Sequence, residues 1–170
     1  MLARNETILK WLRYILAAAL CFLIQGAALQ RITLWGVIPF VYPLVAVIPA
    51  TYEDPLFGTV FALVTGVVCD LLLPDMFPCL YTLVFPVAGF LAALLARSVL
   101  QAGMLCSFLA SVGAFFLLDL FRCFLFWIGG KAAWGAGFSV MAREFLVTAP
   151  LILLATPLFS AVNRKVHADD

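Results

Sequence analysis

Residues 56–73 read LFGTVFALVTGVVCDLLL, an apolar stretch with a single acid, Asp70, near its end. A helix that crosses the hydrocarbon core of a bilayer needs roughly 20 predominantly apolar residues, with a range of about 17–25, and this stretch meets that length. The whole chain has the same character. Of its 170 residues, 66% are hydrophobic and 11% are charged, against about 45–50% and about 25% in soluble domains. The sequence therefore predicts one integral membrane domain over residues 1–170 and excludes soluble and disordered classes.

Five further stretches are long enough to cross the membrane, so we predict a compact all-α bundle of about six transmembrane helices. Their expected bounds are about 12–29, 32–50, 56–73, 79–96, 102–127 and 145–162. The second stretch contains Pro39, Pro43 and Pro49. Because proline removes a backbone donor and clashes with the preceding turn, we expect this helix to be broken and covered by its neighbours. Residues 129–143 are rich in glycine, and we expect a re-entrant or surface loop there.

The basic residues predict the orientation of the bundle. With six spans both termini lie on one side of the membrane. Six Lys or Arg residues belong to that side and three to the other: Arg4, Lys10, Arg13, Arg97, Arg164 and Lys165 against Arg31, Lys131 and Arg143. Because cytoplasmic loops carry the excess of Lys and Arg, we expect both termini to be cytoplasmic.

Small residues recur along the span from which we started. Gly58, Ala62, Gly66 and Asp70 follow one another at intervals of four, so they share one helical face, and small residues on such a face let another backbone approach closely. The pattern predicts a docking face that ends in a carboxylate. Two interpretations remain open for it, packing within this bundle or contact with a partner chain. Pro39 and Pro43 in the broken span belong to the same candidate interface.

Three charged residues lie in or close to the predicted spans. Asp70 comes shortly before Pro74, where it either serves a function or caps the next turn of the chain. Asp119 and Arg122 are three residues apart, so they share a face and can neutralise each other. Such a pair either specifies how the bundle packs or forms an ion pair with another subunit.

Patterns that carry chemistry do not occur in the sequence. It contains no HExxH, no GxSxG and no phosphate-binding glycine loop, and the single histidine, His167, follows the last span. No two of the five cysteines form a CxxC pair, and we expect all five to be small packing residues. The net charge of +1 lacks the basic excess of a nucleic-acid binder. We therefore expect no catalytic, cofactor or metal site and no nucleic-acid partner.

Residues 39–97 resemble the rod shape-determining MreD family of bacteria. The shared features are a proline-led apolar span, a turn that ends in Pro-Leu-x-Gly, a small-residue helix that closes in Gly-x-x-x-Asp-Leu-Leu, and an apolar helix that ends in arginine. The residues that carry them are Pro55, Gly58, Gly66, Asp70, Leu71, Leu72, Gly89 and Arg97. The acidic Glu53-Asp54 turn and the turn at residues 74–78 depart from the family pattern.

The resemblance implies a non-enzymatic scaffold subunit of the cell-elongation machinery in the bacterial inner (plasma) membrane. Such a subunit would bind the transmembrane helix of MreC. Through MreC it would help couple MreB filaments to peptidoglycan synthesis by RodA and its partner transpeptidase.

A second hypothesis comes from a different class, the substrate-binding subunit of an energy-coupling-factor vitamin transporter. Such subunits resemble this chain in length and in their six short-looped helices. A binding subunit needs convergent polar and aromatic side chains near the outer face and a long first loop that acts as a lid. The corresponding loop is expected here at only about residues 30–36.

Overall fold

The computed structural model describes residues 2–73, 77–130 and 134–167, and the side chains of 8–73, 77–130 and 134–164. The elements are α1 (Leu2–Ala27), a 3₁₀ turn η1 (Leu29–Arg31), α2 (Tyr42–Tyr52), α3 (Pro55–Leu72), α4 (Leu80–Ser98), α5 (Met104–Ile128) and α6 (Trp134–His167). Within the described ranges, α1, α3, α4, α5 and α6 are long and apolar enough to cross a membrane, whereas α2 is shorter. This arrangement is consistent with a multi-pass, all-α membrane protein.

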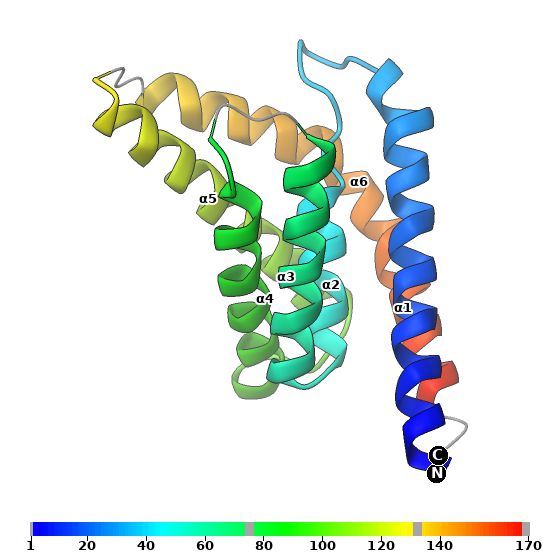
Figure 1. Cartoon of the computed structure of the whole chain (residues 1–170). Coiled ribbons are helices and arrows are strands. Elements are labelled where there is room, and N and C mark those ends of the chain that lie inside the picture. Colours follow the sequence, from blue (N-terminus) through cyan, green and yellow to red (C-terminus); the bar gives the residue numbers. More distant parts are fainter. Residues whose placement is uncertain (1, 74–76, 131–133, 168–170) are drawn as a thin grey trace.

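The helices surround α2 (Figure 1). Helices α3 and α4 lie against it, α5 rises beside α4 and leans outward, and α6 returns across the bundle before it descends beside α1. Pro150 and Pro157 lie inside α6, and Figure 1 shows this helix bending along its length, as proline in a helix interior requires. The beginning of α1 and the end of α6 lie at the same end of the bundle.

Helix α2 forms the centre of the core. Every residue from Tyr42 to Thr51 is buried, and the helix contacts α1, α3, α4, α5 and α6. A helix that is apolar on all sides belongs in an interior. Its eleven residues reach only about 16 Å at 1.5 Å per residue, about half of a hydrocarbon core of roughly 30 Å. The second element is therefore a half-length buried helix.

The chain before α2 differs from the predicted span over residues 32–50. Between η1 and α2 it follows an irregular path that includes an isolated bridge between Leu34 and Val37. The turn inside that bridge has positive φ angles at Trp35, +53°, and Gly36, +78°. The prolines were expected to break a helix, but the segment from residue 32 to the start of α2 at Tyr42 is not helical at all.

Two further expectations need correction. Residues 134–143, assigned to a loop from sequence, belong to the first turns of α6; residues 131–133 lie outside the described part of the chain. Cys79 is exposed, whereas the other four cysteines are buried as expected. The position explains the difference, because Cys79 is the residue directly before α4, where it adopts a left-handed conformation.

Candidate functional site

The small-residue face of α3 lies inside the bundle. A Cβ atom at Gly58 would lie 2.7 Å from the Cβ of Ala50 on α2, and one at Gly66 would lie 2.5 Å from the carbonyl oxygen of Tyr81 on α4. Ala62 is fully buried and meets Gly89 of α4, where an added Cβ would lie 2.6 Å away. Of the two interpretations of this face, the geometry matches packing within the bundle, because the chain's own α2 and α4 occupy it.

Asp70 caps the beginning of α4. Its carboxylate accepts the backbone N–H of Tyr81 at 3.1 Å and of Thr82 at 2.8 Å, and also the hydroxyl of Thr82. The first N–H groups of a helix have no partner within the helix, and a carboxylate placed there also interacts favourably with the helix dipole. Asp70 therefore joins the end of α3 to the start of α4, as the capping interpretation expects.

Side chains from distant helices satisfy the irregular backbone before α2. Gln25 of α1 donates to the carbonyl of Pro39 at 2.7 Å and accepts the N–H of Val41 at 3.1 Å. Thr148 of α6 accepts the N–H of Phe40 at 2.9 Å. Non-helical backbone at membrane depth requires such partners, because lipid offers none. Pro39 is buried here, and Pro43 is buried in the first turn of α2.

Asp119 and Arg122 form an ion pair on α5, with 3.6 Å between Oδ1 and Nη1. Arg122 also donates to the hydroxyl of Tyr81 at 2.6 Å, and its guanidinium lies 5.8 Å from the ring centre of Phe40 and 5.7 Å from that of Tyr81. The pair therefore faces other helices of the same chain.

Glu144 of α6 is a member of this group that the sequence did not predict. It interacts electrostatically with both Asp119 and Arg122. Glu144 directly follows the loop that the sequence predicted at 129–143. Because the sequence did not predict that α6 begins at Trp134, it gave no helical face on which to place Glu144.

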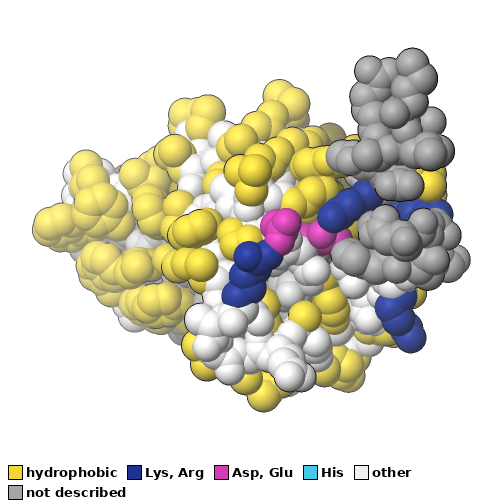
Figure 2. Space-filling view, turned by 90° about the horizontal axis from the view of Figure 1, so that it is seen from below, with side chains coloured by type: hydrophobic (Ala, Val, Ile, Leu, Met, Phe, Trp, Pro, Cys, Tyr) yellow, Lys and Arg dark blue, Asp and Glu magenta, His cyan; other side chains and the backbone are white. Residues whose placement is uncertain are grey.

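A second charged cluster lies at the end of the bundle where α1 begins and α6 ends (Figure 2). The buried carboxylate of Glu53 accepts from Lys10, from the Tyr14 hydroxyl at 2.8 Å and from Asn163 at 3.2 Å. These contacts tie α1 and α6 to the turn between α2 and α3. In the same turn Asp54 pairs with Arg97 at the end of α4. Glu53 and Asp54, the two acids of this turn, thus each have a basic partner.

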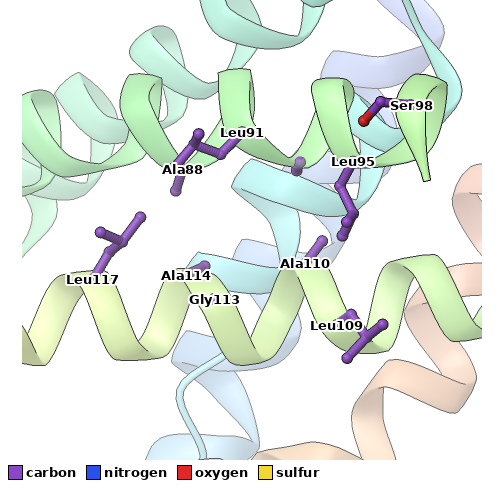
Figure 3. A pocket seen from close by; sticks show the side chains of 10 residues that line it. Ala88, Leu91, Leu95, Ser98, Leu109, Ala110, Gly113, Ala114 and Leu117 are labelled. Carbon is purple, nitrogen blue, oxygen red and sulfur yellow. The ribbon is translucent and has the colours of Figure 1, made fainter. Parts of the chain in front are cut away.

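A groove lies between α4 and α5 (Figure 3). Its volume is about 350 Å³. It is lined by Ala88, Leu91, Ala92, Leu95 and Ser98 of α4 and by Leu109, Ala110, Gly113, Ala114 and Leu117 of α5. All of these side chains except Ser98 are apolar, and small residues alternate with leucines. Ala88 with Ala92 and Ala110 with Ala114 repeat the four-residue spacing that favours close helix approach.

Gly113 distinguishes this groove from the small-residue face of α3. A Cβ atom at Gly113 would meet no atom within 4 Å, whereas at Gly58, Gly66 and Gly89 it would collide with neighbouring helices. Glycine in a helix interior is about 1 kcal/mol less favourable than alanine. The packing of this chain therefore gives no reason for glycine at position 113, and the space beside it is open.

Within the described residues, no group of three or more His, Cys, Asp and Glu side chains could hold a metal ion. The buried acids instead contact arginine, lysine, backbone N–H groups and hydroxyls. The chain matches no family model, and no curated protein and no solved structure is significantly similar to it.

Proposed function

We propose that this protein is a non-enzymatic membrane scaffold that binds one transmembrane helix of a partner protein. The resemblance of residues 39–97 to the MreD family suggests the setting: the elongation machinery of the bacterial inner membrane, with both termini cytoplasmic. The partner is then MreC, through which the scaffold acts on MreB filaments, RodA and the associated transpeptidase.

The observation that carries the proposal is the open groove between α4 and α5. Its lining is apolar, so its occupant is apolar as well, and the alanines and Gly113 at its floor allow a helix backbone to approach closely. Between helices in lipid, close packing replaces the hydrophobic effect as the source of affinity. A transmembrane helix fits this chemistry, and the groove takes the partner-binding role that was one of the two open interpretations for the face of Gly58, Ala62 and Gly66.

The polar contacts inside the bundle support a scaffold over an enzyme. Asp70 caps a helix, Glu53 accepts from three side chains, and Gln25 bonds the backbone. These groups hold the helices in place, and each has its partners within the chain. A rigid frame of this kind presents a fixed groove to a partner helix.

The test is co-purification of MreC with this protein from gently solubilised membranes. Gly113 lines the groove, and a Cβ atom there meets no atom of the chain within 4 Å. We therefore expect Gly113→Leu to place its side chain in the groove, so that the protein inserts normally and the partner is lost. Gly26→Leu is the matched control, because a Cβ at Gly26 also meets no atom within 4 Å but lies on α1. Equal recovery of MreC with both variants would contradict the groove assignment.

One observation favours the second candidate, a vitamin-binding transporter subunit. The connection between α1 and α2 runs through residues 28–41, longer than the loop expected at 30–36, and such a connection has the length of a lid. Mass spectrometry of the purified protein decides between the two candidates. A vitamin retained in stoichiometric amount would establish the binding subunit, whereas partner recovery without a retained small molecule supports the scaffold.

A further inference from the structure

Asp119 is a buried carboxylate with one unpartnered oxygen. The residue is 6% exposed, and its Oδ1 faces Arg122 at 3.6 Å. Its other oxygen, Oδ2, has less than 1 Å² of accessible surface and no hydrogen-bond partner within the described structure. A buried ionised oxygen without a donor is strongly unfavourable, and more so within a membrane. The Oδ2 atom of Asp119 therefore lacks a bonding partner.

A second carboxylate shares the same arginine. Glu144 projects from α6, which packs against α5, and it interacts with both Asp119 and Arg122. The ionisable groups that the described structure places around Asp119 are Arg122 and Cys123 on α5, Tyr81 on α4 and Glu144 on α6. Arg122 is the only cation among these four groups. Two carboxylates that interact in a site of low polarity disfavour double ionisation.

The small accessible surface of Oδ2 limits which partner it can bind. The surface of Oδ2 is too small for contact with a water molecule or a metal ion, and the described residues contain no cluster with the ligands for a metal. A proton needs no additional volume. Once it binds, the carboxyl group is neutral, and burial of a neutral group is far less costly than burial of a charge.

We propose that Asp119 and Glu144 form an intramembrane proton-binding site that takes up one proton from water and returns it to water. On uptake the proton enters at Glu144, the less buried of the two carboxylates, where hydronium becomes water; an O–H bond forms on one carboxylate oxygen of the pair, and release reverses the step. Arg122 stays charged throughout and keeps its contact with the Tyr81 hydroxyl. The site gives the bundle a bound proton on α5, which packs against α4 on one side and α6 on another, a property beyond the scaffold role.

The test is infrared difference spectroscopy of the protein in lipid bilayers during a titration from acidic to alkaline buffer. A protonated buried carboxyl gives a carbonyl stretching band that shifts in heavy water. We expect wild type to show such a band, Asp119→Asn to lose it, and Glu144→Gln to lose or shift it. Both substitutions retain the shape of the side chain, and the wild-type titration alone tests the proposal if either variant fails to fold.

Asp70→Asn is the matched control, because the Asp70 carboxylate accepts from two N–H groups and a hydroxyl. We expect the band to remain in this variant. Absence of a carboxyl band in wild type at every pH, or a band that persists unchanged in both Asp119→Asn and Glu144→Gln, would overturn the proposal. Neither result depends on whether MreC binds the groove.

Discussion

The side chain of Gln25 bonds the backbone on both sides of Phe40, with its nitrogen 2.7 Å from the carbonyl oxygen of Pro39. Gln25 is 2% exposed and lies on α1, whereas Pro39 belongs to the irregular segment before α2. One amide therefore supplies both the donor and the acceptor that a helical turn would have supplied. This contact explains how a proline-rich, non-helical segment persists among helices that are long and apolar enough to cross a membrane.

We expect Gln25→Leu to destabilise the protein strongly. The change leaves the Pro39 carbonyl and the Val41 N–H buried without partners, at about 1–3 kcal/mol for each group. For a chain of this size each kcal/mol lowers the melting temperature by roughly 2–4 °C. Thermal unfolding in detergent measures the effect. Gln30→Leu is the control, since Gln30 is exposed in η1, and an equal loss of stability in both variants would contradict the assigned role.

Two glycine substitutions should have opposite effects on stability. Gly66→Ala places a methyl group 2.5 Å from the backbone oxygen of Tyr81, and because backbone yields poorly, we expect a loss of about 1–3 kcal/mol, typical of overpacking. Gly113→Ala meets open space and gains helix propensity of up to about 1 kcal/mol. Side-by-side unfolding curves check the pair. The packing scheme fails if Gly66→Ala is as stable as Gly113→Ala.

Labelling of Cys79 tests the orientation of the bundle. Cys79 is the exposed cysteine of the described set and precedes α4, whereas Arg97 near the other end of that helix pairs with Asp54. If both termini are cytoplasmic, Cys79 faces outward. We expect a membrane-impermeant maleimide added to intact cells to label wild type but not Cys79→Ser. If Cys79 is labelled only after the membranes are permeabilised, Cys79 faces the cytoplasm and the predicted orientation is wrong.

Hydropathy predicted the bounds of three long helices closely, because their lengths match the thickness of the bilayer, whereas α1 and α6 begin ten or more residues before the expected spans 12–29 and 145–162. Helices α3, α4 and α5 begin and end within two residues of the expected bounds. Hydropathy could not predict the backbone conformation of residues 32–50. A segment that is buried on all sides is apolar whether it is helical or irregular, and only the positions of Gln25 and Thr148 in three dimensions show how its backbone is satisfied.

The candidate site was predicted in part, for a similar reason. Spacing placed Asp119 beside Arg122 and put Gly58 and Gly66 on one face, since both relations lie within a single helix. The electrostatic interaction of Glu144 with that pair and the open space beside Gly113 arise between helices. Contacts between helices depend on packing angles and register, which a single sequence does not reveal.

Site-specific photo-crosslinking tests the central claim most directly, the binding of a partner helix between α4 and α5. A photoreactive amino acid at Leu117 lies in the groove, whereas the same residue at Leu154 of α6, which is 69% exposed, lies outside it. In cell membranes we predict a crosslink to MreC from position 117 and none from position 154. A crosslink from position 154 alone, or none from position 117, would contradict the account.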